Sequence, residues 1–394
     1  MPVAVVAALS LVLAACGSSG APSGSSSSGS GGTKTFTVGF IGSLSGPLEA
    51  LGSAWLAGLK DSIAYQESQG APYQITVDAQ DDRNDPPTAV TAARSIYASQ
   101  PLAIVGIPAS NVGAAIAPLA LANKVPVVGT GILPPQNPYS YAAGLDITQT
   151  FADEVPLFKQ LAQQSGKPQT RVALLASDTA SGHKSVAPVQ SLVKGSGVSV
   201  VSTQYINVTG TSFDPQAAQV VAAKADIVGV TNTATSMLAI VHSLRAAGFT
   251  GAIVNYWAGA SAAMLKQLND PNMFVYRDFA DPAETAAGNM AKQAASVQGS
   301  DPTTFVNGNY YTEGWVVGML LMNVLKACGS ACTAQTFNTA LQTKASSVDT
   351  GGLTGTNGFT TNNHTFLHEV SYWTWDKAKQ AEAPVAALPK APAN

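Results

Sequence analysis

Apolar segments typical of β-strands alternate with segments of helical spacing along most of this 394-residue chain, which constrains the fold more than any other feature. In the first part of the chain the strand-like segments are 36–41, 73–77, 102–106 and 125–129. Helical patterns separate them at 51–65, from Asp85-Pro86 onward, and at 111–122. This order is typical of βαβ units, whose parallel strands form one sheet. The sequence therefore predicts an α/β fold with a doubly wound parallel sheet.

The same alternation begins again after a loop rich in Pro and Tyr, residues 134–141. Further helices are predicted at 148–165, 185–194, 215–224 and 236–247, and further strands at 171–175, 198–201, 226–230 and 253–254. A helical block then follows, with helices at 284–297, 311–326 and 333–344, before a late strand at 365–375. We therefore predict two similar α/β lobes and a helical block that a simple tandem repeat does not explain.

The first 15 residues have the pattern of an export signal. Residues 2–15 carry no charge and are almost all apolar, although no Lys or Arg precedes them. Fourteen residues are too few for a membrane-spanning helix, which needs about 20, but they fit the apolar core of a signal peptide. The run ends in Ala14-Ala15-Cys16, which resembles the lipobox of bacterial lipoproteins. We therefore expect a signal peptide over 1–15 and a lipid on Cys16.

The residues that follow Cys16 are almost entirely Gly and Ser as far as Gly32. A tract of this composition behaves as a flexible coil. We therefore expect residues 16–33 to tether a folded body to the extracytoplasmic face of a membrane. In an exported protein the remaining cysteines, Cys328 and Cys332, are expected to form a disulfide.

Charge and motif content argue against several other classes of protein. Only 11% of the residues are charged, the net charge is −3, and no run of Lys or Arg occurs, so the basic face that nucleic-acid binding needs is missing. The sequence has no Gly-x-Ser-x-Gly nucleophile motif and no phosphate-binding Gly-Lys-Ser/Thr loop. We therefore expect no catalytic residues, no cofactor and no nucleic-acid partner.

Two clusters of possible metal ligands have simpler interpretations. His364 and His368 lie in a β-rich segment, where four residues span about 13 Å, too far to share an ion. Asp78, Asp81, Asp82 and Asp85 lack the spacing of a calcium loop, and Asp85 precedes Pro86 as a helix N-cap would. We therefore expect a strand and a turn at these places, and no metal site.

Several segments, taken in order, resemble the Leu/Ile/Val-binding protein family, the type I periplasmic binding proteins that serve ABC transporters. They are Val38-Gly-Phe-Ile-Gly-Ser-Leu-Ser-Gly-Pro47 with Leu51-Gly52, Asp81-Asp82-Arg-Asn-Asp85-Pro86, Ile104-Val-Gly106 through Ser110, Val125-Pro-Val-Val-Gly129, Glu313-Gly314-Trp315 and the turn between Cys328 and Cys332. The resemblance covers roughly residues 35–377. It implies two lobes joined by a hinge of three crossings: 34–146 with 277–348, and 147–276 with 349–380, followed by a flexible tail at 381–394.

The strand order also predicts where a ligand would bind. Ligands of open parallel sheets lie beyond the carboxyl ends of the strands, beside helix N-termini. The residues expected in these loops are Ser43, Ser45, Leu51, Ser110, Asn111, Thr130, Gly131, Ile132, Leu133, Ser181, Thr233, Tyr256 and Trp257.

The resemblance implies roles for some of these residues. The serine that holds a ligand carboxylate in the family corresponds to Ser110 or Asn111, and its backbone contacts after the fourth strand correspond to Gly131 and Leu133. An aromatic residue of the first loop corresponds to Leu51, and two tyrosines fall near Ser181 and Thr233. The acid that pairs with the ligand's α-ammonium corresponds to Trp257. An amide, a small aromatic or an aliphatic acid therefore fits as well as an amino acid, although Asp178 on a neighbouring loop is a substitute acid.

Together these observations favour a monomeric, lipid-anchored solute-binding protein at the cell surface or in the periplasm. It would capture a small polar or amino-acid-like ligand between its lobes and deliver it to an ABC transporter permease. A ligand-sensing receptor with the same cleft stays open as an alternative, and neighbouring permease and ATPase genes would distinguish the two. A secreted hydrolase is the third alternative, which an assay for ligand turnover would test.

Overall fold

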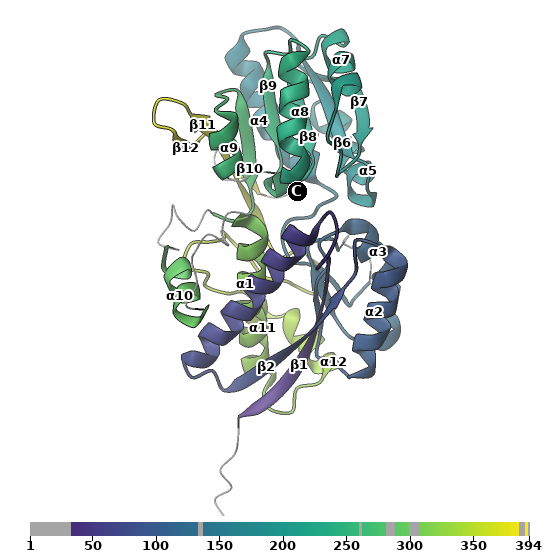
Figure 1. Ribbon diagram of the computed structural model, residues 1–394, viewed down its shortest axis with the longest axis vertical. Coiled ribbons are helices and arrows are strands. Elements are labelled where there is room, and N and C mark those ends of the chain that lie inside the picture. Colours follow the sequence, from purple (N-terminus) through teal and green to yellow (C-terminus); the bar gives the residue numbers. More distant parts are fainter. Residues whose placement is uncertain are drawn as a thin grey trace, which may run out of the picture. The chain divides into compact units, whose positions relative to one another are not determined.

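The computed structural model describes residues 33–132, 137–259, 262–280, 288–298, 308–385 and 391–392. These residues form two lobes, each built on its own β-sheet with helices on both faces (Figure 1). The signal peptide, Cys16 and most of the tether lie outside the described residues. No helix among the described residues is long and apolar enough to cross a membrane.

The first lobe contains a five-stranded parallel sheet with the order β2-β1-β3-β4-β5. Its strands are β1 (Lys34–Gly42), β2 (Tyr73–Asp81), β3 (Ile104–Gly106), β4 (Val127–Gly129) and β5 (Ser140–Ala142). Its helices are α1 (Glu49–Ser68), α2 (Pro86–Ala98), α3 (Ser110–Asn123), α10 (Gly288–Gln298), α11 (Gly308–Cys328) and α12 (Ala334–Leu341), with a short 3-10 helix at Lys344–Ser346.

The second sheet has the order β12-β11-β10-β9-β8-β6-β7, with β13 paired to β11. Its strands are β6 (Thr170–Ser177), β7 (Val198–Ile206), β8 (Ile227–Thr231), β9 (Ala252–Asn255), β10 (Met273–Arg277), β11 (Glu369–Asp376), β12 (Ala381–Pro384) and β13 (Ala391–Pro392). The accompanying helices are α4 (Thr150–Ser165), α5 (Ala180–Val186), α6 (Val189–Leu192), α7 (Asp214–Ala222), α8 (Ala234–Ala246) and α9 (Ala262–Leu268), with a 3-10 helix at Trp257–Gly259.

The two lobes share one strand order when the strands of each are counted separately. In the second lobe β7-β6-β8-β9-β10 repeats the order of β2-β1-β3-β4-β5, and β11 then adds to β10 in the antiparallel direction. This confirms the predicted pair of doubly wound parallel-sheet lobes. In each sheet the order reverses beside the first strand, so the loops after β1, β3, β6 and β8 lie at the switch points where such sheets bind ligands.

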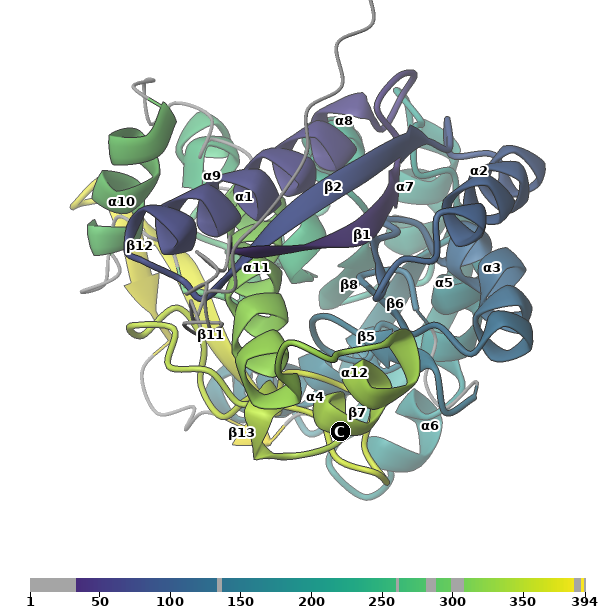
Figure 2. The same cartoon turned by 90° about the horizontal axis from the view of Figure 1, so that it is seen from below.

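Each sheet is buried on both faces by alternate residues of its strands. On the first sheet Ile41, Ile104 and Val127 pack with α2 and α3, whereas Phe40 and Val105 belong to the cluster that includes α1 and α11. Figure 2 shows the same division, with α2 and α3 on one side of β1 and β2 and α1 and α11 on the other.

Helices α1 and α11 meet at glycines that permit close backbone approach. A Cβ atom on Gly58 would lie 2.0 Å from the carbonyl oxygen of Tyr311, and one on Gly314 would lie 2.0 Å from that of Trp55. Side chains at these positions would push the helices apart. This contact fixes the start of α11, which carries Tyr310 and Glu313 to the region between the lobes.

The tail of the chain differs from the prediction. We predict a flexible tail from residue 381, but β12 and β13 pair with β11, so part of the tail extends the second sheet. Strand β10 was not predicted, although Met273-Phe-Val-Tyr276 is apolar and rich in β-forming residues. The short strand β5 begins inside the loop expected at residues 134–141 from its Pro and Tyr content.

The segment before β11 packs on the first lobe. The backbone N–H groups of Ala142 and Phe366 donate to His364 and Ala142 respectively, and the Tyr141 and Phe359 rings lie 4.9 Å apart. These contacts suggest that the third crossing lies near Leu367–Glu369, later than the expected boundary at 349.

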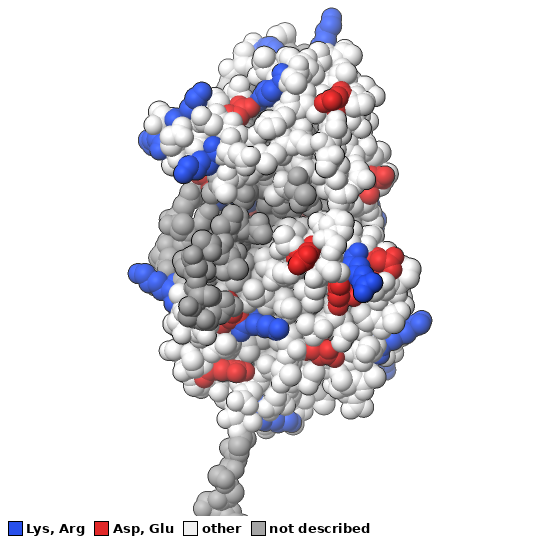
Figure 3. All heavy atoms as spheres, in the orientation of Figure 1, with Lys and Arg blue, Asp and Glu red and all other residues white. Residues whose placement is uncertain are grey.

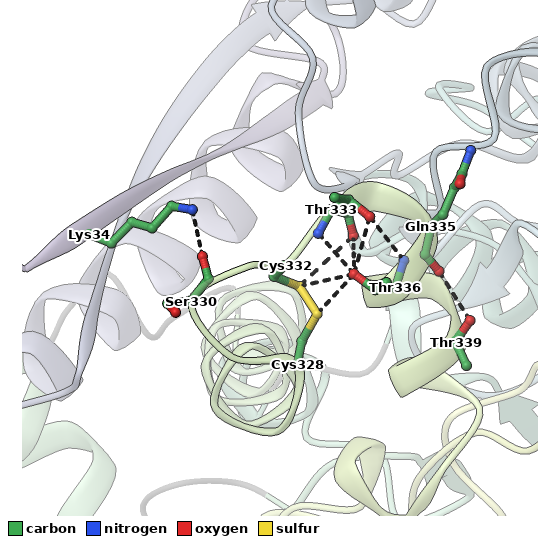
Figure 4. The surroundings of a disulfide bond; sticks show 8 residues. All are labelled: Lys34, Cys328, Ser330, Cys332, Thr333, Gln335, Thr336 and Thr339. Carbon is green, nitrogen blue, oxygen red and sulfur yellow. Dashed lines mark hydrogen bonds between the residues drawn. A yellow bond between two sulfur atoms is a disulfide. The ribbon is translucent and has the colours of Figure 1, made fainter.

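The predicted disulfide is present between Cys328 and Cys332, whose Cα atoms are 5.3 Å apart. It closes the turn between α11 and α12, where the Thr333 hydroxyl caps α12 by accepting from the Thr336 N–H (Figure 4). The Lys34 ammonium group at the start of β1 donates to the Ser330 carbonyl oxygen at 2.5 Å. The disulfide therefore holds one turn beside the point where the tether enters the fold.

We expect the double variant Cys328→Ser/Cys332→Ser to lose only about 2 kcal/mol of unfolding free energy, because the bond closes a loop of five residues. Urea unfolding with and without reductant measures this change. Ligand affinity should not change, because neither cysteine lies near the ligand-binding region described below. Two reactive thiols in the folded parent protein would show instead that the disulfide is absent.

Candidate functional site

A cavity of about 210 Å³ lies between the two lobes, at the carboxyl ends of the strands. This volume equals the liquid volume of about seven water molecules. The lining residues come from the loops after β1, β2, β3 and β4, from the first crossing, from the loops after β6, β7, β8 and β9, and from α11. They are Leu48, Leu51, Asn84, Pro108, Ala109, Ser110, Asn111, Thr130, Ile147, Thr150, Ser177, Asp178, Thr179, Ser181, Gly182, Val208, Thr231, Thr233, Tyr256, Trp257 and Tyr310.

The start of α3 reaches the cavity through a strained turn. Ile107, which follows β3, has a φ of 53° although it is β-branched, and its side chain is fully buried. Such a residue rarely adopts the left-handed region unless the surrounding structure holds it there. Two short backbone hydrogen bonds fix it: its N–H donates to Ile41 and its carbonyl oxygen accepts from Gly131. The turn directs Ser110 and Asn111 to the cavity.

A hydrogen-bonded pair of serines joins the two lobes across the cavity. The Ser110 hydroxyl of α3 donates to the Ser181 hydroxyl of α5 at 3.1 Å, and the Ser181 N–H donates back to Ser110 Oγ at 3.2 Å. Ser181 Oγ also lies 3.1 Å from the Thr179 hydroxyl, which lies 3.0 Å from that of Ser177. The lobes are thus in direct polar contact, and this chain of hydroxyl groups lines the cavity.

Aromatic side chains form one wall of the cavity. The Trp257 ring lies 5.4 Å from that of Tyr256 and 5.7 Å from that of Tyr310, measured between ring centroids. Trp257 is 2% exposed, and no described residue accepts a hydrogen bond from its Nε1. Burial raises the pKa of Tyr256 and Tyr310, so both are neutral phenols at physiological pH.

The N-termini of three helices point their free backbone N–H groups toward this region. Residues at the start of α3, α4 and α8 line the cavity: Ser110, Thr150 and Thr233. None of these helices has a side-chain cap. The N-cap residues of α3 and α4 are Ala109 and Gln149, whose side chains make no cap hydrogen bond, and the Thr233 hydroxyl at the start of α8 donates to the Val208 carbonyl oxygen instead. The free N–H groups of a helix start carry partial positive charge and suit an anion.

Charged side chains are scarce around the cavity. Among the described lining residues Asp178 is the one acid, and no Lys, Arg or His lines it. The Asp178 side chain is 66% exposed and lies 2.7 Å from His183 Nε2, so it sits at the rim. Charged groups are also sparse and scattered over the face of the molecule in Figure 3.

Two buried carboxyl groups lie behind the lining at the crossings. A Cβ atom on Gly144, in the first crossing, would lie 3.1 Å from Asp278 Oδ2 and 3.9 Å from Glu313 Oε1. Burial raises the pKa of Asp278 to about 7, and burial together with Asp278 raises the pKa of Glu313 to about 8. The Thr130 hydroxyl, which lines the cavity, donates to Glu313 Oε1 at 2.8 Å. At pH 7 Glu313 is therefore mostly protonated and Asp278 about half protonated, and Glu313 orients one lining residue.

Seven of the residues predicted to bind a ligand lie together around the cavity: Leu51, Ser110, Asn111, Ser181, Thr233, Tyr256 and Trp257. Thr130, which was also expected in these loops, lines it as well. Whether they bind a ligand stays a prediction. Ser45, Gly131 and Ile132 are not among the lining residues, and Leu133 lies outside the described residues.

The contacts of Ser45, Gly131 and Ile132 explain why these residues do not line the cavity. The Ser45 hydroxyl donates to Asp81 Oδ2 at 2.5 Å, and Ser43 likewise donates to Asp82, so these acids hold the first loop. Gly131 packs against the backbone of Ala109, and Ile132 is fully buried with α2 and α3. Asp85 caps α2 by accepting from the Thr88 N–H, as predicted.

The two histidines have structural contacts in the turn before β11, not in the strand itself. His364 stacks on Tyr141 with 4.3 Å between ring centroids and contacts the Ser140 carbonyl oxygen, and His368 contacts Thr365 and Asn363. No group of three His, Cys, Asp or Glu residues placed to hold a metal ion occurs in the described ranges.

Tyr310, Thr150 and Ile147 line the cavity but were not predicted from the sequence. Tyr310 comes from α11, far along the chain, and no local pattern shows that this helix returns to the first lobe. Thr150 begins α4, whose start was placed two residues early, at 148. Thr179 lies in the loop after β6, and Thr231 is the last residue of β8. The expectation that ligands bind beyond the carboxyl ends of the strands, which identified Ser181 and Thr233, therefore covers them too.

Comparison with known proteins agrees with this architecture. Residues 35–380 match the family model described as "Periplasmic binding protein". A branched-chain amino acid ABC transporter protein from Thermus thermophilus with bound valine is 15% identical, with a TM-score of 0.79, covering 91% of this chain and 97% of that chain. No curated protein sequence matches the chain.

Two further solved structures are similar in fold. The solute-binding protein from R. palustris in complex with 4-hydroxybenzoate is 17% identical, with a TM-score of 0.76 over 91% of this chain and 98% of that chain. A fatty acid ABC transporter substrate-binding protein from Thermomonospora curvata is also 17% identical, with a TM-score of 0.76, covering 91% of this chain and 93% of that chain. Because the family model spans nearly the whole folded part, this chain belongs to the periplasmic binding protein family.

Proposed function

We propose that this protein is an extracytoplasmic, lipid-anchored solute-binding protein that captures one small ligand between its lobes and delivers it to an ABC transporter permease. The observation that carries the proposal is the cavity lined by both lobes and bridged by Ser110 and Ser181. Valine, 4-hydroxybenzoate and fatty acids are named for the similar structures, which supports a small amino acid, amide or organic acid as ligand.

The mechanism would be a population shift between open and closed forms. A ligand that contacts lining residues of both lobes at once stabilises the closed form by its differential affinity for the two forms. In the open form Ser110 and Ser181 would separate and expose the free N–H groups of α3 and α5. The family supports binding without chemical conversion of the ligand, and with no cofactor.

The lobe boundaries are part of the proposal. We place one lobe at 34–146 with 277 to about 367, and the other at 147–276 with about 368–385, because residues 357–366 pack on the first lobe. A monomer suffices for this function, since one chain supplies both walls of the cavity.

Ligand closure and delivery are tested together. Solution scattering should show a smaller radius of gyration when a ligand is bound, and deleting the gene should abolish uptake of that compound. The variant Ser110→Phe, which would fill the cavity, should not restore uptake, whereas parent protein should. Normal uptake in the deletion strain, combined with a ligand-dependent change in signalling, would favour the sensing receptor instead.

Lipid anchoring is tested at Cys16. We expect Cys16→Ser to leave an uncleaved or mislocalised protein, because the thiol is the site that a diacylglycerol would occupy in the motif Ala14-Ala15-Cys16. Partitioning into the detergent phase measures the anchor. If the variant partitions as the parent does, the anchor lies elsewhere or is absent, and the binding function is unaffected by that result.

A further inference from the structure

We propose that the ligand is a small monocarboxylate that carries no ammonium group, and this inference rests on the solute-binding function proposed above. The remainder of the ligand would be uncharged, with a branched aliphatic or aromatic body. Three independent features of the cavity carry this inference: uncompensated helix N-termini, an unpaired indole N–H, and the absence of a buried ionised acid among the described lining residues.

The helix N-termini make the cavity favourable for one negative charge. Helices α3 and α8 come from opposite lobes, have 14 and 13 residues, and begin at the cavity without a capping side chain. Neither has an acidic residue in its first turn. The partial positive charges of both ends, roughly half an elementary charge each, are therefore uncompensated by side chains.

The indole of Trp257 is a second and independent donor. Trp257 lines the cavity and is 2% exposed, yet its Nε1–H has no acceptor among the described residues. A buried donor without an acceptor is costly, and nearly all such groups in native proteins are paired. A ligand oxygen would supply the missing acceptor. The hydroxyl groups of Ser110, Ser181 and Thr179 add further donors once the lobes rearrange around it.

An ammonium group would find no equivalent partner. Asp178 is mostly exposed and already pairs with His183, so it offers a hydrated charge at the rim. Asp278 and Glu313 do not line the cavity, and burial raises the pKa of Asp278 to about 7 and that of Glu313 to about 8, so neither is a fully ionised acid at neutral pH. Desolvating a cation without a buried anion would cost several kcal/mol, so a free amino acid is disfavoured.

The walls define the body of the ligand. Leu48, Leu51, Ile147 and Val208 are apolar, and the aromatic wall of Trp257, Tyr256 and Tyr310 faces the same space. No Lys, Arg or His among the described lining residues is available for a second carboxylate. A monoacid of modest size therefore fits better than a diacid or a sugar.

Two matched series of probes test the inference on the full protein by isothermal titration calorimetry. The aliphatic series is 4-methylpentanoate, leucine and 4-methylpentanamide, and the aromatic series is 3-phenylpropanoate, phenylalanine and 3-phenylpropanamide. Within a series the hydrocarbon body of the compound is constant, while the compound is an anion, a zwitterion or a neutral amide. We expect the acid of at least one series to bind at least tenfold more tightly than its amino acid and its amide.

Single-residue variants test which side chains determine the affinity for the acid. Trp257→Phe keeps a ring but removes the N–H, so it should weaken binding of the acid about tenfold, the size of a lost charge-assisted hydrogen bond. Trp375→Phe is the matched control, because Trp375 lies outside the lining and donates to Asn269. Asp178→Asn should tighten binding of the acid by less than about fivefold, since the carboxylate it removes is exposed.

The outcomes separate this inference from the proposed function. Tighter binding of leucine or phenylalanine, lost in Asp178→Asn, would overturn the inference and leave the solute-binding function intact. Equal binding of acid and amide would overturn it too. If none of the six probes binds, the inference is wrong, and a screen of other compound classes then decides the proposed function separately.

Discussion

Trp257→Ala is expected to weaken ligand binding by roughly 1–3 kcal/mol, the range for losing a large buried apolar contact. The residue lines the cavity from the second lobe, packs beside Tyr256, and has a buried indole N–H without an acceptor among the described residues. Titration calorimetry with the best acid or amide measures the change. The same variant should lose about 3–5 kcal/mol of unfolding free energy, because its side chain is 2% exposed.

A control separates the two effects. Trp375→Ala removes a similarly buried tryptophan, 4% exposed, from the opposite face of the second sheet. It should reduce stability by a comparable amount and leave affinity unchanged wherever the protein remains folded. If Trp257→Ala binds as the parent does, or if both variants lose affinity equally, the wall assigned to Trp257 is wrong.

The second large effect is a loss of stability as pH rises from about 4 to 8. The pKa of Asp278 rises from 3.8 to about 7 and that of Glu313 from 4.5 to about 8 on folding, mainly through burial. Folding therefore favours their protonated forms. The unfolding free energy that these two groups contribute is fully present below their unfolded-state pKa values. It is lost as pH rises through their folded-state pKa values. Each group therefore contributes about 4 kcal/mol to the loss of unfolding free energy over this window.

Urea unfolding of parent and Asp278→Asn/Glu313→Gln between pH 4 and 8 measures this loss. The double variant should show a much shallower decline, with a residual slope from Glu154, whose pKa burial also raises. His364 acts in the opposite direction below about pH 6.5, because burial lowers its pKa, and the difference between the two proteins cancels its effect. Parent stability that is constant or rising across this window would contradict the raised pKa values of Asp278 and Glu313.

Much of the site was accessible from sequence because it follows from local rules. The strand-end rule placed Ser110, Asn111, Ser181 and Thr233 in the right loops, since parallel strands carry their functional residues at one edge. The position of a residue at a strand end does not show whether its side chain faces the cavity or forms hydrogen bonds that stabilise the loop. Ser45 was expected at the cavity, but Asp81 binds its hydroxyl, a contact between residues 36 positions apart.

Other features depend on distant segments and left no local signal. The left-handed Ile107 is held by β1 and by Gly131 in the loop after β4, and nothing in Gly106-Ile107-Pro108 specifies it. Tyr310 and Glu313 reach the site because Gly58 and Gly314 let α11 pack closely on α1. The pairing of β12 with β11 was hidden because Ala381-Glu-Ala-Pro384 has poor strand propensity.

Native mass spectrometry tests the central claim, capture of one small molecule between the lobes, most directly. The full protein is incubated with a library of small acids, amides and amino acids, and its mass is compared with that of Ser110→Phe, folding being checked by circular dichroism. The account predicts one ligand per chain in the parent and none in the folded variant. A parent that binds nothing, or an adduct that persists unchanged in Ser110→Phe, would contradict it.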